Sequence, residues 1–378
     1  MSSSAGKQHH RLPNLYNATS APPPTPSSQP NTHYHHATSA AAAVDSLSRL
    51  LHRLPAPTLS LPTRSSSSPI TSPPLISLAD PNTTDLLLSA SCQLGFFQLT
   101  DHGIPSHLAN SSESESLSLF DLTRDQKESY FPKNWPLGFD DDEVGNGESF
   151  WLDSACSTES TELNLSSLPE LTHALEKLGL EIVEMLSRIV GFENPLKEDP
   201  TQICSLMLVH EGSCGDKPAI SGGFYPYVVG LQYQFRSQKY SLLADSGWVT
   251  VQPHVESVMV TIGDIAQVWS NGKLKKVRGR PMASSFTGKG NNSSFISMTL
   301  LVTLPIESTV SPLLPKPIVT EENAKESEVR EEEEEEEENH GSKEERMFSS
   351  FSFEDYAWRV YHEPLLFKDP LDKYRIIR

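Results

Sequence analysis

One stretch in the second half of the chain decides the fold. It reads Trp248-Val-Thr-Val-Gln-Pro, then Val258-Met-Val-Thr-Ile-Gly-Asp-Ile-Ala-Gln-Val-Trp-Ser-Asn-Gly-Lys, and then Lys276-Val-Arg-Gly-Arg-Pro. Short runs of β-branched and aromatic residues alternate here with residues that favour turns. We therefore predict strands at 248–251, 258–262 and 266–269, with a hairpin turn at the Asn-Gly pair 271–272.

Similar short runs lie on both sides of this stretch. They cover residues 205–210, 230–235 and 295–304. Repeated short strands with turn residues between them are typical of a jelly roll. The predicted fold is therefore mostly β with flanking helices (α+β), built on a double-stranded β-helix core.

Helical patterns precede this β region. A Leu, Ile and Met stripe at helical spacing predicts a helix over 169–190 that ends at Gly191. A shorter helix is expected over 84–92, between short strands at 75–78 and 95–100.

The order of these elements resembles the plant 2-oxoglutarate and Fe(II)-dependent dioxygenases, such as the gibberellin oxidases. Besides the central stretch, the resemblance rests on Gly95-Phe-Phe, on Asp101-His-Gly-Ile-Pro and on the closing segment 351–359. It covers about 74–310 and 348–378. The resemblance implies a jelly-roll barrel, and a structural role for the histidine of the Asp101 motif.

The resemblance also implies an iron site, and the sequence departs from the family at that site. Such a site holds its metal with two imidazoles and one carboxylate. The matching positions carry Phe224, Pro226 and Gly279, none of which offers an electron pair to a metal. The family binds the 2-oxoglutarate carboxylate with an Arg-x-Ser pair, for which this chain has Phe295 and Ser297.

Three other residues offer an alternative set of metal ligands, namely His210, His254 and Glu256. The last two have the spacing of a His-x-carboxylate pair, but no histidine follows them until His340. We therefore expect no catalytic residues and no cofactor. Fe(II) and 2-oxoglutarate are expected only if the alternative set forms a site.

Two main functional hypotheses follow from the resemblance and the substitutions. The first is a catalytically inactive pseudo-oxygenase that acts as a binding or regulatory module for an unknown protein partner or a small apolar or acidic ligand. The second is an active, gibberellin-oxidase-like oxygenase with an atypical metal site, acting on a plant hormone or specialised metabolite. A third hypothesis is an interaction protein that works through its tails.

Composition restricts the partners and the compartment. The net charge of −19 over 378 residues disfavours nucleic-acid binding. No apolar run reaches the roughly 18 residues that span a bilayer. Four scattered cysteines without a C-x-x-C pair favour a reducing compartment. The expected location is the cytoplasm, with the nucleus and import into the chloroplast left open.

The predicted organisation has five parts. They are a disordered Ser/Pro/His-rich tail (1–72) with a short helix at 44–54, an N-terminal dioxygenase-type domain (73–165), a helix with the jelly-roll barrel (166–310), an acidic disordered insertion (311–347), and a C-terminal helix and tail (348–378).

Charge is concentrated in two places. Between residues 321 and 346, 14 glutamates face four basic residues, which gives a local net charge of −10. Like charges in a block repel one another and stay solvated. A basic rim is expected in the β region, formed by Arg236, Lys239, Lys273, Lys275, Lys276, Arg278 and Arg280. We expect this rim to be solvated, and an alternative is that the acidic insertion folds back over it.

Overall fold

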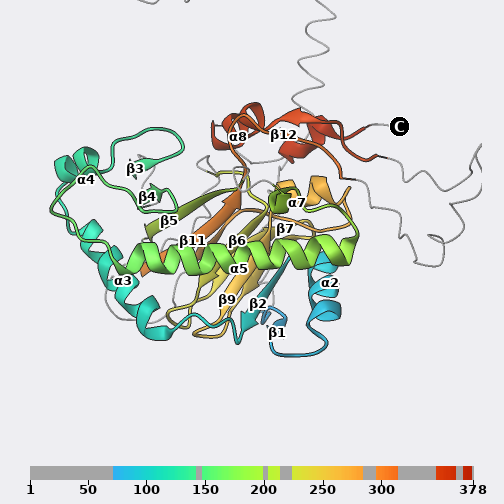
Figure 1. Ribbon diagram of the computed structural model, residues 1–378, viewed down its shortest axis with the longest axis horizontal. Helices are drawn as coiled ribbons and strands as arrows, with labels where there is room; N and C mark the ends of the chain where they lie inside the picture. The colour runs from blue at the N-terminus through green and yellow to red at the C-terminus, as the bar shows by residue number, and fades with distance from the viewer. Residues whose placement is uncertain are drawn as a thin grey trace, which may run out of the picture. The chain divides into compact units, whose positions relative to one another are not determined.

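Strands from both halves of the chain join in one large sheet (Figure 1). They are β1 (Leu75–Ser77), β2 (Phe96–Thr100), β3 (Gly138–Asp141), β4 (Glu148–Leu152), β5 (Cys204–Gly212), β6 (Val229–Tyr233), β9 (Val258–Ile262) and β11 (Phe295–Thr303). Their order across the sheet is β1-β2-β9-β6-β11-β5-β4-β3. The β1–β2 pair is parallel and the other pairs are antiparallel.

A second, smaller sheet has the order β10-β7-β8. Its strands are β7 (Tyr240–Ala244), β8 (Gly247–Val251) and β10 (Val277–Ala283). Phe96 and Met259 of the large sheet share an apolar cluster with Leu242, Val251 and Val277 of the small one. Two sheets that bury a common apolar interior form the jelly-roll core that the repeated short strands predicted.

This computed structural model describes residues 71–141, 147–198, 203–212, 224–283, 295–313, 346–362 and 369–376. These residues lie in one compact unit, 64–378. Of the predicted tail 1–72 only the last two residues are described, so the short helix expected at 44–54 lies outside this part of the chain. Most of the acidic insertion, 314–345, also lies outside it. Within the described ranges, no helix combines the length and apolarity that a bilayer crossing requires.

The long helix α5 (Ser167–Val190) covers one face of the large sheet, as Figure 1 shows. It confirms the helix predicted over 169–190, and Gly191 ends it in the left-handed conformation, with φ of 89°. Gly179 faces the sheet, where a Cβ would lie 2.7 Å from Cγ2 of Val302. A larger residue at Gly179 would therefore push the helix away from β11.

Four further helices lie in the described part of the chain before β5. They are α2 (Thr83–Gln93), α3 (Ser106–Phe120), α4 (Arg124–Tyr130) and the single turn α6 (Pro195–Glu198). A capping box begins α4, because Thr123 accepts the backbone N–H of Gln126 while the Gln126 side chain accepts the backbone N–H of Thr123.

A carboxylate from α3 caps the start of α5. Glu115 accepts the backbone N–H groups of Ser167 (2.9 Å) and Leu168 (2.8 Å) and the hydroxyl of Ser166 (3.2 Å). These donors would otherwise have no partner within the helix. Partial burial raises the pKa of Glu115, but the hydrogen bonds from Ser167, Leu168 and Ser166 outweigh burial, and the net shift is downward.

We expect Glu115→Gln to lower the free energy of unfolding by about 1 kcal/mol at neutral pH. The carboxylate is more acidic in the folded state than in the unfolded state. The contribution of the Glu115 charge to stability is therefore complete above the pKa of the unfolded state, about 4.3. It is lost as the pH falls through the lower pKa of the folded state. Urea unfolding of both proteins at several pH values measures this. An equal difference at pH 7 and pH 3 would contradict the role of the charge.

One predicted strand is a helix. Residues 266–269 belong to α7 (Asp264–Trp269), which is buried along most of its length. Both the strand and the hairpin turn predicted next to it were wrong. Asn271 and Gly272 have positive φ values (51° and 84°), and the Gly272 N–H donates to the Gln267 carbonyl (2.8 Å). The same left-handed pair that closes a hairpin can also end a helix, and here it does so.

The C-terminal segment folds back onto this region. Strand β12 (Thr309–Val310) pairs with β13 (Phe351–Ser352), followed by α8 (Phe353–His362) and the 3-10 turn η3 (Pro370–Tyr374). The predicted closing helix over 351–359 thus corresponds to β13 and α8.

A lysine of the expected basic rim is buried under this segment. Lys276 is 0% exposed, and its Nζ lies 2.6 Å from Oδ1 of Asp264 and 2.7 Å from Oδ1 of Asp369, just before η3. The expectation of a solvated rim is therefore wrong for Lys276, because the buried Asp369 and the largely buried Asp264 compensate its charge.

Candidate functional site

Three positions of this chain match the iron ligands of the resembled dioxygenases, and the structure brings two of them together. Phe224 precedes β6, and Gly279 lies in β10. A Cβ built on Gly279 would lie 2.5 Å from Cε1 and 2.7 Å from Cζ of the Phe224 ring. These distances are shorter than any normal carbon–carbon contact. The ring therefore occupies the space that a side chain at position 279 would need.

The backbone at Gly279 has a conformation that favours glycine. Its φ is +69°, and the register between β10 and β7 shifts between Arg278 and Met282. Such a bulge, with a left-handed glycine, re-aims the strand locally. A histidine with ordinary strand geometry does not fit this backbone.

Tyr227 holds this bulge from inside the barrel. Its hydroxyl lies 3.2 Å from the Val277 carbonyl, 3.1 Å from the Gly279 carbonyl and 3.2 Å from Oγ1 of Thr261. Complete burial raises the pKa of Tyr227, so the hydroxyl keeps its proton for donation. No sequence pattern pointed to Tyr227, because only the bulge places two carbonyl groups of β10 within reach of its hydroxyl.

The segment that contains the third position is also fixed by packing. Pro226 is buried, and its carbonyl accepts a hydrogen bond from Oγ1 of Thr303 (2.7 Å). Its neighbour Tyr225 packs against Trp135 and Phe353, with ring centroids 5.7 and 5.8 Å apart. Residues 224–227 are therefore anchored by aromatic contacts and backbone hydrogen bonds.

The co-substrate positions lie on β11. Ser297 is paired with His210 of β5, and His210 is paired with Ser149 of β4. Paired residues of adjacent strands share one face of a sheet, so these three side chains form a row. Phe295 begins β11 opposite Gly212, and its side chain lies outside the described part.

The alternative ligand set does not come together. His210 is buried on β5, whereas His254 and Glu256 are exposed in the turn before β9. Strands β11 and β6 lie between β5 and β9 in the sheet. Among the residues that the structure describes, no group of three His, Cys, Asp or Glu side chains could hold a metal ion. The alternative site based on these residues is therefore not formed.

The turn at Glu256 has a structural role. Glu256 has a φ of 62°, and its carbonyl lies 2.9 Å from Nε2 of His102. Nδ1 of the same ring accepts the backbone N–H of Ile104 (3.2 Å), so Nε2 carries the proton that it donates. His102 therefore ties the start of α3 to the turn before β9, as the resemblance implied.

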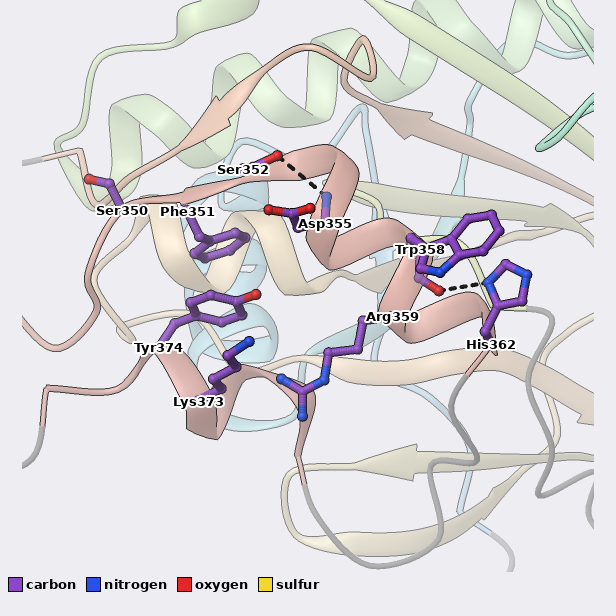
Figure 2. A pocket seen from close by; sticks show the side chains of 9 residues that line it. All are labelled: Ser350, Phe351, Ser352, Asp355, Trp358, Arg359, His362, Lys373 and Tyr374. Atoms are coloured by element: carbon purple, nitrogen blue, oxygen red, sulfur yellow. Dashed lines mark hydrogen bonds between the residues drawn. The ribbon is translucent and has the colours of Figure 1, made fainter. Parts of the chain in front are cut away.

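A groove of about 630 Å³ lies between α8 and η3, and none of these positions lines it (Figure 2). Its lining residues are Ser350, Phe351, Ser352, Asp355, Trp358, Arg359, His362, Lys373 and Tyr374. The sequence predicted only a helix and a tail for residues 348–378, without a groove between them. The available signal was the placement of Trp358, Arg359 and His362 within about one helical turn.

The side chains at positions 224, 226 and 279 offer no ligand to a metal ion. Phe and Pro side chains have no donor atom, and Gly has no side chain. The phenyl ring also fills the space beside Gly279. These three residues do not fit an iron ion.

Comparison with known proteins identifies the relatives of the chain. Residues 73–162 match the model of the non-haem dioxygenase N-terminal domain, described from morphine synthesis, and residues 216–289 match the 2OG-Fe(II) oxygenase superfamily. Gibberellin 2-beta-dioxygenase 1 of Pisum sativum is 26% identical over 266 residues, which cover 64% of this chain and 79% of the relative.

Solved structures agree with the predicted fold. The dioxygenase for auxin oxidation of rice covers 81% of this chain and 100% of its own length, with a TM-score of 0.57 and 18% identity. The structure of JOX2 in complex with 2OG, Fe and JA covers 83% of this chain and 92% of its own, with a TM-score of 0.58 and 17% identity. The predicted jelly-roll core with flanking helices is confirmed.

The same comparisons correct one expectation. We expected no cofactor, but residues 216–289 match a superfamily that is described by Fe(II) and 2-oxoglutarate. A solved structural neighbour also contains both. Fe(II) and 2-oxoglutarate are therefore the cofactors implied by the match to this superfamily, although residues 224, 226 and 279 do not provide ligands for the metal.

Proposed function

Because the chain belongs to the 2-oxoglutarate–Fe(II) oxygenase superfamily, we propose that it is a member that has lost oxygenase turnover and uses its barrel as a binding or regulatory module. The single observation that carries this proposal is the contact between Phe224 and Gly279. Two positions that match iron ligands are filled by one aromatic ring packed on a glycine bulge.

Two further features of the site support the proposal. The substitutions at 224 and 279 are matched to each other, because the ring of Phe224 lies against Gly279 and Tyr227 holds the bulge, while Pro226 is buried. A buried polar ligand set without its metal would leave unpaired groups that cost about 1–3 kcal/mol each. Apolar residues at these positions remove that cost, so the barrel needs no metal to satisfy buried polar groups there.

The ligand of such a module is an unknown protein or a small apolar or acidic molecule. The relative from Pisum sativum is named a gibberellin 2-beta-dioxygenase, and the rice structure is that of an auxin-oxidising enzyme. A related small carboxylic acid is therefore a reasonable class to screen for binding without conversion.

The proposal is tested by turnover of 2-oxoglutarate. Purified full-length protein is incubated with Fe(II), ascorbate and 2-oxoglutarate, with and without candidate carboxylic acids, and succinate is measured. We expect no succinate above a parallel sample that contains a chelator. JOX2 with JA, which form a solved complex with 2OG and Fe, serves as the positive control for the assay.

Succinate formation that the chelator abolishes would overturn the proposal. It would support the competing hypothesis, an active oxygenase with an atypical metal site acting on a plant hormone or specialised metabolite. Binding of a carboxylic acid in a thermal-shift assay, without succinate, is the result expected of a binding module.

A further inference from the structure

The groove between α8 and η3 has aromatic walls at both ends. Phe351 and Tyr374 stack at one end with ring centroids 4.2 Å apart, and Trp358 and His362 lie 3.7 Å apart at the other. Trp358 is 55% exposed, which is unusual for a large aromatic side chain. Exposed aromatic side chains around a concave surface are typical of recognition sites.

Positive charge lies between these walls. Figure 2 shows Arg359 extending from α8 and Lys373 from η3 into the space between the two elements. Of the nine described residues that line the groove, Asp355 alone is acidic. Two permanent cations and a histidine therefore face one carboxylate. The groove suits a negatively charged segment more than a neutral or basic one.

The chain supplies such a segment beside the groove. Ser350 lines the groove, and Arg346, four residues earlier, is the last residue of the glutamate-rich segment 321–346. The 32 residues 314–345 lie outside the described part. The segment is held at both ends, by residues 313 and 346, so it can extend about 50 Å from these anchors. Its glutamates can therefore reach the groove.

The basic rim that the sequence predicted is a poorer site for these glutamates. Lys276 is buried between Asp264 and Asp369, and Arg236 forms an ion pair with Glu113. Part of the charge of the rim is therefore already compensated within the fold.

We propose that the groove between α8 and η3 is a docking site for the glutamate-rich segment 321–346 of the same chain. Each exposed ion pair in such a contact is weak, but the segment is tethered next to its site. Tethering gives a high effective concentration, and several glutamates can exchange on the same cations. This inference does not depend on the chemistry of the barrel.

The test is zero-length carbodiimide cross-linking of the full-length protein, followed by peptide mass spectrometry. The reagent joins a lysine amine to a carboxylate only when the two are in contact. We expect the monomer to contain an amide between Lys373 and a glutamate of 321–345. Raising the salt from about 0.02 M to about 1 M should lower its yield at least fivefold, because salt screens exposed charges. Lys177, exposed on α5, is the matched control.

A charge reversal tests the contribution of the second cation. Arg359→Glu should lower the Lys373 cross-link about tenfold, whereas Arg188→Glu on the exposed face of α5 should leave it unchanged. Circular dichroism confirms that both variants are folded, and the salt series needs no variant at all. Equal cross-linking of Lys177 and Lys373, or cross-links found only in dimers, would overturn the proposal.

Discussion

Replacing Lys276 with methionine is expected to lower the free energy of unfolding by about 3–5 kcal/mol, since it removes one partner of a buried ion pair. The Nζ of Lys276 lies between Oδ1 of Asp264 (2.6 Å) and Oδ1 of Asp369 (2.7 Å), and the side chain is fully buried. Without the lysine, the buried carboxylate of Asp369 and the largely buried carboxylate of Asp264 face each other with little screening by water. Arg278, 3.5 Å from Asp369, compensates only part of this charge.

The stability of the protein should depend on pH through the ionisation of Asp369. Burial raises its pKa, but the charges of Lys276 and Arg278 and the N–H of Leu371 outweigh burial, so the net pKa is lowered. Its contribution to stability is therefore present above the unfolded pKa of about 3.9 and is lost as the pH falls through the lower folded value. In the Lys276→Met protein this loss should be smaller, because Asp369 then lacks its main partner.

Urea unfolding at pH 7 measures the effect, with Lys133→Met as the matched control. Lys133 forms an ion pair of the same length with Asp140 (2.6 Å), but its side chain is 59% exposed, so its loss should cost at most about 1 kcal/mol. A triple variant, Lys276→Met with Asp264→Asn and Asp369→Asn, should be more stable than Lys276→Met alone. Equal costs for Lys276→Met and Lys133→Met would contradict the role assigned to the buried pair.

Sequence patterns predicted the helices and strands in which one face is buried along the whole length of the element. Helix α5 has a long apolar stripe and a terminal glycine, and both features are local. Residues 266–269 were placed in a strand because a short apolar run that is buried on all sides has no periodicity. Strand β10 contains Arg, Gly and Pro, and it forms because β7 pairs with it rather than because of its own residues.

The positions of the candidate site could be predicted from the sequence, but the contact between them could not. Motif order was sufficient to align Phe224, Pro226 and Gly279 with the family's ligand positions. The contact between the ring and the glycine was not predictable, because it depends on a bulge in a distant strand and on the Tyr227 hydroxyl. Lys276 was assigned to a solvated rim because its partner Asp369 lies far along the chain.

Replacing Gly279 with alanine is the second change for which we expect a large effect, a loss of about 2–5 kcal/mol of unfolding free energy. A left-handed residue with a Cβ costs about 1–2 kcal/mol, and the contact with the Phe224 ring at 2.5 Å adds about 1–3 kcal/mol of overpacking. Gly103→Ala is the matched control, because its φ of +73° is close to the +69° of Gly279 and its Cβ would meet nothing within 4 Å.

A double-mutant cycle with Phe224→Ala separates the contact from the backbone strain. Once the ring is removed, the cost of Gly279→Ala should fall to that of Gly103→Ala, which is a coupling of about 1–3 kcal/mol. A cost that does not change in the Phe224→Ala background would mean that the ring does not occupy the space beside Gly279. A histidine at 279 begins with the same Cβ and needs still more room. Restoring that one residue would therefore meet the same two obstacles, the ring of Phe224 and a backbone conformation that favours glycine.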